Sequence, residues 1–136
     1  MSAWRREALK RLPECKRTIE EVDNPMALWT ELLGKCEEAY TTSKEDMIRR
    51  FYEFAWWCWK SQSDDVRTAV ACAFYEHLPR NPKMRRDLPR RFGRETFEEL
   101  REVFCYLLSL QEAAEFDREY LEAEREFVRR TWRRAD

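Results

Sequence analysis

The chain has 136 residues, of which 43% are hydrophobic, 14% aromatic and 39% charged. This hydrophobic fraction excludes a disordered chain, and the presence of only 2 glycines favours long helices over a turn-rich β structure. With 26 Lys and Arg against 27 Asp and Glu, the formal net charge is -1, so binding to nucleic acid or to an anionic membrane would require a local patch.

The length predicts one domain over residues 1–136, because a domain typically has about 100 to 200 residues. We expect an N-terminal helical segment over about 1–22, a helical core over 25–109 and a long C-terminal helix over 110–136. The most apolar run, residues 54–59, is far shorter than the ~20 residues of a membrane helix, so no membrane span is expected. The charged start and five cysteines without a CxxC pair predict a cytoplasmic protein whose cysteines are small buried apolar residues.

Capping residues mark the predicted helix starts. Asn24 and Asn81 each precede a proline suited to the first helical position. Ser43 and Ser63 are followed by acidic residues, and Ser109 stands three residues before an acidic residue, as in a capping box. Together with breaks at Pro13 and Gly93, these signals predict helices that begin near Pro25, Lys44, Asp64, Pro82, Arg94 and Leu110.

Every predicted helix carries an apolar stripe with a period near 3.6 residues, and no segment alternates as a strand does. The clearest stripe runs without interruption from Val66 to Leu78. Short connections at 41–43 and 61–63 make neighbouring helices antiparallel. The predicted fold is therefore all-α, with about six to seven helices in antiparallel hairpins, arranged as a compact HEAT-like stack or a helical bundle.

Two segments resemble known helical proteins. The segment from Asp64 to Leu78, with its acid, Val-Arg pair, small residues and terminal Leu, resembles a HEAT-repeat helix. Residues 47–104, with Phe51-Tyr-Glu-Phe54, Asp-Asp-Val-Arg, Phe-Tyr-Glu-His-Leu and Leu88-Pro-Arg-Arg-Phe-Gly93, resemble a family of small bacterial helical proteins of unknown function. Some proteins of that type are suspected of immunity or partner-binding roles, so the resemblance implies a helical fold and a partner-binding function, and it implies no catalytic residues.

The residue types needed for common catalytic sites are scarce. His77 is the only histidine, which excludes sites that need two, and it lies on an apolar stripe where a structural role is expected. Cys72 lies five residues before His77 on the same predicted helix, at a poor angle for a Cys–His pair. Two glycines cannot form a phosphate-binding loop. We therefore expect no enzyme, no cofactor and no metal site, and we interpret Glu112, Glu115, Glu119 and Glu122 as a solvated acidic face.

Charge is segregated along the C-terminal half. Residues 80–94 contain seven bases against one acid, a local charge of +6, and residues 95–126 contain eleven acids against three bases, a local charge of -8. The basic block could contact phosphates, or it could dock on an acidic face of this protein or of a partner. We favour the second interpretation because the acidic block offers a counter-charge, and an ordinary solvated Arg-rich loop is the third.

The sequence thus predicts a non-enzymatic protein–protein binding module, of the bacterial immunity or adaptor type. The alternative is a nucleic-acid-binding HEAT-like protein that uses residues 80–94. The residues expected at the partner contact are Trp57, Arg85, Arg86, Arg90 and Arg91. A homodimer through the C-terminal helix is a further expectation, since Leu121, Val128 and Trp132 lie beside its main stripe.

Overall fold

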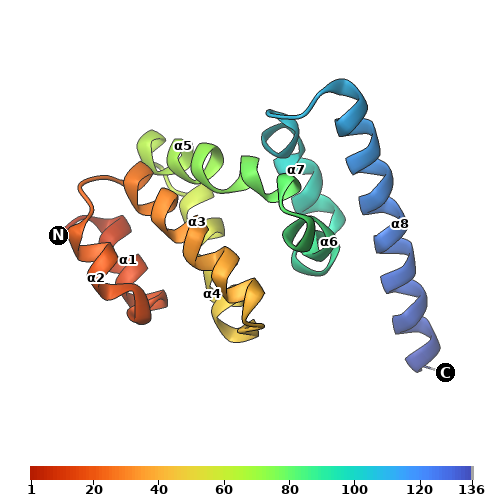
Figure 1. The fold of residues 1–136 in the computed structure, drawn as a ribbon, viewed down its shortest axis with the longest axis horizontal. Coiled ribbons are helices and arrows are strands. Elements are labelled where there is room, and N and C mark those ends of the chain that lie inside the picture. The colour runs from red at the N-terminus through yellow and green to blue at the C-terminus, as the bar shows by residue number, and fades with distance from the viewer. Residues whose placement is uncertain (136) are drawn as a thin grey trace. The chain divides into compact units, whose positions relative to one another are not determined.

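The computed structural model describes the backbone of residues 1–135 and the side chains of residues 1–131 (Figure 1). Within this part of the chain the secondary structure is helical, with eight α-helices and two 3₁₀ segments and no strand. The predicted all-α class is confirmed, although the helices outnumber the six to seven expected. The side chain of Trp132, expected at a dimer contact, lies outside the described residues.

The contacts divide the chain into two units, residues 1–75 and residues 76–136. The boundary falls within the 3₁₀ helix η2 (Tyr75–Arg80). The interpretation of the whole chain as one domain, and of its helices as a HEAT-like stack, stays a prediction.

Unit 1 consists of five α-helices and one 3₁₀ turn. They are α1 (Ala3–Arg11), η1 (Pro13–Cys15), α2 (Lys16–Glu21), α3 (Pro25–Thr41), α4 (Glu45–Trp59) and α5 (Asp64–Ala73). Helix α3 packs against α4 and α5, and α1 packs against α4. Trp29 is fully buried at the centre, with its ring centroid 5.2 Å from that of Phe54 and 4.8 Å from that of Phe74. Burial of such large rings supplies most of the stability of this unit.

Two arginines tie the short N-terminal helices to this core. Arg5 donates hydrogen bonds to the carbonyl oxygens of Ile19 and Val22, at 2.6 and 2.9 Å, and so satisfies the C-terminal end of α2. Arg50 of α4 donates to the carboxylate of Glu14, with Nη1 to Oε1 at 2.7 Å, and to the carbonyl oxygen of Arg11 at 3.0 Å. The hydrogen bond from Arg50 lowers the pKa of Glu14 to about 2.

The predicted helix starts agree closely with the structure. Asn24 and Asn81 accept hydrogen bonds from backbone N–H groups of the first turns, and Ser63 does the same. Ser109 and Glu112 form the reciprocal capping box, with both hydrogen bonds at 3.1 Å. The prediction for Ser43 was wrong: its φ of 55° places it in the left-handed region after α3, and the residue before α4 is Lys44, which provides no side-chain cap.

The helix predicted to run from Asp64 to Leu78 ends at Ala73 and is followed by the tighter η2. Pro79 explains the difference, because it has no N–H to donate and its ring would clash with the carbonyl four residues earlier in an α-helix. The apolar stripe alone could not reveal this change, since both helix types bury Phe74 and Leu78.

Three of the five cysteines, Cys15, Cys36 and Cys58, are buried as expected. Burial raises the pKa of the Cys58 thiol to about 12. The expectation was wrong for Cys72, which is exposed, and for Cys105, which is half-buried, because both lie off the buried stripes of their helices.

Unit 2 contains α6 (Pro82–Arg91), α7 (Arg94–Cys105) and α8 (Leu110–Ala135), the blue helix of Figure 1. Phe97 of α7 and Tyr120 of α8 stack with centroids 3.6 Å apart, and the Tyr120 hydroxyl donates to the carbonyl oxygen of Phe92 at 3.0 Å. Burial raises the pKa of Tyr120 to about 12. Helix α8 is covered only in its first half, because every described side chain from 125 to 131 is exposed.

Candidate partner-binding groove

The basic block of residues 80–94 is largely folded onto acids of its own unit. Arg85 of α6 lies with Nε 2.6 Å from Oε2 of Glu119 on α8, and its guanidinium lies 5.2 Å from the ring centroid of Phe116. Its Nη1 also donates to the carbonyl oxygen of Pro79 at 3.4 Å. The side chain is 21% exposed. Arg85 therefore joins η2, α6 and α8.

Three other bases have acidic neighbours as well. Arg91 lies with Nε 2.6 Å from Oδ2 of Asp87, and Arg90 lies 3.5 Å from the other oxygen of that carboxylate. Arg94 at the start of α7 pairs with Glu124 of α8 at 2.5 Å, and this hydrogen bond raises the pKa of Arg94. Within unit 2, Arg85 and Arg94 therefore pair with acids of α8, and Arg90 and Arg91 pair with an acid of their own helix.

Arg80, Lys83 and Arg86 are exposed and form no ion pair with a described side chain. Lys83 and Arg86 are one helical turn apart on α6, so their charges share a face of that helix. Lys83 and Arg86 are therefore the part of the basic block without an acidic partner among the described residues of unit 2, whereas Arg80 interacts electrostatically with Glu112.

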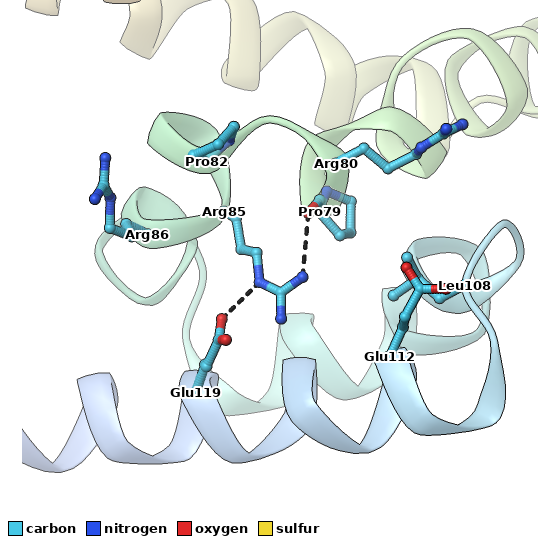
Figure 2. Close-up of a pocket in the computed structure, with 8 residues that line it drawn as sticks. All are labelled: Pro79, Arg80, Pro82, Arg85, Arg86, Leu108, Glu112 and Glu119. Carbon is cyan, nitrogen blue, oxygen red and sulfur yellow. Dashed lines mark hydrogen bonds and ion pairs between the residues drawn. The ribbon is translucent and has the colours of Figure 1, made fainter.

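A pocket of about 470 Å³ lies on one side of the Arg85–Glu119 pair. Its lining residues are Pro79, Arg80, Pro82, Arg85, Arg86, Leu108, Glu112 and Glu119. In Figure 2 Arg85 reaches down from α6 to Glu119, whereas Arg86 points away from that pair. Hydrogen bonds from Ser109, with a smaller contribution from Arg80 and Arg85, lower the pKa of Glu112, so its carboxylate stays charged. The pocket therefore holds both signs of charge beside two proline rings.

A second hollow of about 750 Å³ shares Arg85, Arg86 and Glu119 with the first. Its other lining residues are Pro89, Phe116, Tyr120, Glu122, Ala123 and Arg130. Pro89 stands inside α6, where it presents a ring instead of a backbone donor. We refer to the two hollows together as the α6–α8 groove.

The α6–α8 groove has an apolar floor and walls of different charge. Pro89, Phe116 and Ala123 contribute to the floor, the α6 side carries Arg85 and Arg86, and the α8 side carries acids with Arg130 at its far end. Its α8 residues run from position 112 to position 130, a length of about 27 Å at the helical rise of about 1.5 Å per residue. This length suits a chain segment better than a small metabolite.

The five residues predicted at a partner contact belong to both units, and their role in binding stays a prediction. Arg85 and Arg86 line the groove, but Arg85 is committed to Glu119. Arg90 and Arg91 approach Asp87. Trp57 belongs to unit 1, where it is half-buried with its ring centroid 6.1 Å from that of Phe54.

Sequence reasoning missed the residues that form the groove floor. Phe116, Tyr120 and Ala123 belong to the apolar stripe of the predicted C-terminal helix, which indicates burial and not a groove, and Pro89 lies within the motif from Leu88 to Gly93. A proline inside a predicted helix was the one local signal that could have drawn attention to this position.

Other kinds of site are not apparent in the described residues. Among them, no three His, Cys, Asp or Glu side chains come together in a way that could hold a metal ion. Within the same part of the chain, no helix combines the length and the apolar character needed to cross a membrane.

The fold and the groove define an all-helical protein with a solvent-open, mixed-charge surface groove. The chain belongs to the family described as "Domain of unknown function (DUF7674)", whose model matches residues 5–107. The match includes η2, α6 and α7 and ends before α8, so one wall of the groove lies outside it. No curated protein and no solved structure matches the chain.

Proposed function

We propose that this protein is a non-enzymatic protein–protein binding module, and that the α6–α8 groove is its docking surface. The observation that carries the proposal is the groove itself: it runs about 27 Å along α8, has Pro89, Phe116 and Ala123 in its floor, and is flanked by Arg86 and by the acids of α8. A segment of amphipathic helix matches these features, because its apolar face can cover the floor while its charged sides meet the walls.

The charges of the groove favour a segment with an acid on the side that faces α6 and bases on the side that faces the acids of α8. Arg86 and the neighbouring Lys83 and Arg80 form no ion pair with a described side chain, so a partner carboxylate would not have to displace an internal acid. Arg130 extends the same sign of charge to the far end of the groove. Charge complementarity of this kind sets the orientation and the association rate of a complex.

The same residues give less support to nucleic-acid binding through the basic block. Arg85, Arg91 and Arg94 already approach acids, and Glu119 and Glu122 in the groove would repel phosphates. A protein therefore matches the charges of the groove better than a nucleic acid does. As its specific form we propose a bacterial immunity or adaptor protein that acts in the cytoplasm.

The test compares two matched variants of one helix in a pull-down from the source cell. Ala123 and Ala114 are both exposed on α8, but only Ala123 lines the groove. We expect Ala123→Glu to lose a co-purifying protein that wild type and Ala114→Glu retain. Arg86→Glu should weaken the same capture, while Arg17→Glu, which changes an exposed arginine of unit 1, should not.

Equal capture by Ala123→Glu and Ala114→Glu would contradict the assignment of the groove. Co-purification of nucleic acid that dissociates steeply with added salt and is lost in Arg86→Glu would instead support the alternative function.

A further inference from the structure

Helix α8 has an apolar face that continues beyond the helices it packs against. Phe127 is 51% exposed and Val128 is 46% exposed, although Phe116 and Tyr120 earlier in the helix are buried. Eleven residues separate Phe116 from Phe127, which is close to three helical turns, so the two side chains lie on the same stripe. Val128 stands seven residues after Leu121 and extends the neighbouring stripe. The exposed part of α8 from residue 125 to residue 131 is called the α8 extension below.

The charges of α8 are divided between its two halves. Residues 110–124 carry six acids and one arginine, a net charge of -5, and residues 125–136 carry five arginines and two acids, a net charge of +3. Two copies of this helix placed antiparallel would bring the acidic half of each opposite the basic half of the other. A parallel arrangement would instead place like charges together.

From these observations we infer that the α8 extension of one copy docks in the α6–α8 groove of a second copy, reciprocally, to form an antiparallel homodimer. The inference rests on the proposed function, because it uses the same groove and names its occupant. Phe127 and Val128 supply an apolar face that can cover the exposed Ala123 and the half-buried Pro89 of the groove floor.

Charge complementarity supports this occupant over an unrelated segment. The arginines of the extension, Arg129 and Arg130 among them, would lie beside Glu119 and Glu122, which line the groove of the other copy. Glu126 of the extension would lie near the α6 wall, where Arg86 forms no ion pair with a described side chain. The interface is isologous, so each copy both offers an extension and receives one.

The experiment is light scattering coupled to size exclusion on the purified full chain, from about 5 to about 500 µM, since an interface of two short helical segments is typical of a weak complex. We expect the mass of wild type to rise from 16.7 kDa towards twice that value with concentration. Phe127→Glu should raise the dissociation constant of the dimer at least tenfold, so that the measured mass stays near that of the monomer. Tyr106→Glu changes an exposed aromatic residue at the α7–α8 connection, outside the groove, and should dimerise as wild type does.

A groove variant completes the test. Pro89→Glu places an acid on the groove floor and restores a helical N–H donor. Arg86→Glu changes an exposed residue of the same groove and replaces the first variant if that variant does not fold. Each variant alone should be monomeric. An equal mixture of Pro89→Glu and Phe127→Glu should recover a heterodimer, because the intact extension of the first can enter the intact groove of the second.

Three results would overturn the inference: a monomeric wild type at every concentration, a dimer that persists in both groove variants, or no recovery in the mixture. A monomeric wild type combined with groove-dependent capture of another protein in cells would leave the proposed function standing. A monomeric wild type that also captures no protein through the groove would contradict both the homodimer and the proposed function.

Discussion

Units 1 and 2 bury their apolar residues to different extents. Among the side chains that the structure describes, unit 1 has twenty-one buried apolar residues and unit 2 has nine. The large apolar side chains that remain exposed show the opposite distribution: Met1 and Met26 in unit 1, and Tyr106, Leu107, Leu110, Phe127 and Val128 in unit 2. Exposed apolar residues are typical of interaction surfaces, so this distribution supports the proposal that unit 2 carries the binding surface.

The two units also use arginine differently. In unit 1, Arg5 and Arg50 hold short N-terminal helices against the core. In unit 2, Arg85 and Arg94 connect α8 to the helices before it, so the groove wall depends on ion pairs between helices. Salt and charge substitutions should therefore affect unit 2 more than unit 1.

The largest expected effect is in the core of unit 1. Trp29→Ala removes a fully buried ring that contacts Phe54 and Phe74, so it should lower the free energy of unfolding by about 3 to 5 kcal/mol, measured by urea denaturation. Trp57→Ala is the matched control, because Trp57 is half-buried and contacts Phe54 from the edge of the core. Equal losses for the two variants would contradict the central position of Trp29.

A smaller effect is expected in the core of unit 2. Tyr120→Phe keeps the ring stacked on Phe97 but removes the hydroxyl that donates to the carbonyl of Phe92. The free energy of unfolding should fall by about 1 to 2 kcal/mol, because the buried carbonyl loses its partner. Hydrogen exchange at α7 and α8 should rise while exchange at α3 stays unchanged; a uniform rise would show that the units do not unfold separately.

Arg85 and Arg86 provide a sharper comparison within one helix. Arg85→Ala should cost about 1 kcal/mol of stability, since it removes the contacts with Glu119, Pro79 and Phe116. Arg86→Ala should leave stability within about 0.5 kcal/mol of wild type, as expected for an exposed surface residue. Thermal unfolding of both variants measures these losses. A larger loss of stability for Arg86→Ala than for Arg85→Ala would contradict the structural role of Arg85.

The smallest effect concerns pH and Glu14. Its pKa of about 2 lies below the usual value because Arg50 donates to the carboxylate, so the ion pair contributes fully above about pH 5 and is lost as the pH falls through about 2. The side chain is 45% exposed, so we expect a contribution of no more than about 1 kcal/mol. The stability difference between wild type and Glu14→Gln should shrink as the pH is lowered from 6 to 2. A constant or growing difference would contradict this origin.

Local signals in the sequence were enough for most helix starts. Asn24 and Asn81 before prolines, and the Ser109 box, act within one helical turn, so short-range chemistry determines them. The end of α5 could not be placed from its stripe, because the effect of Pro79 on the backbone competes with an apolar pattern that both helix types satisfy.

The groove depends on contacts that local signals do not contain. Arg85 and Glu119 are 34 residues apart, and charge segregation favoured docking of the basic block on an acidic face without showing which arginines would be neutralised. Trp57 was chosen because its helical position places it on the side of Arg50 and Glu53, whereas its exposure depends on how α4 packs. Long-range packing therefore decides which charged and aromatic residues remain available to a partner.

The most direct test of the groove is photocrosslinking in living cells from a photoreactive residue placed at position 123, with position 114 as the control on the same helix. Both positions are exposed, and only position 123 lines the groove. We predict crosslinks to protein from position 123, either to a second copy or to a partner, and few from position 114. Equal crosslinking from the two positions, or none from position 123, would contradict the groove as the binding surface.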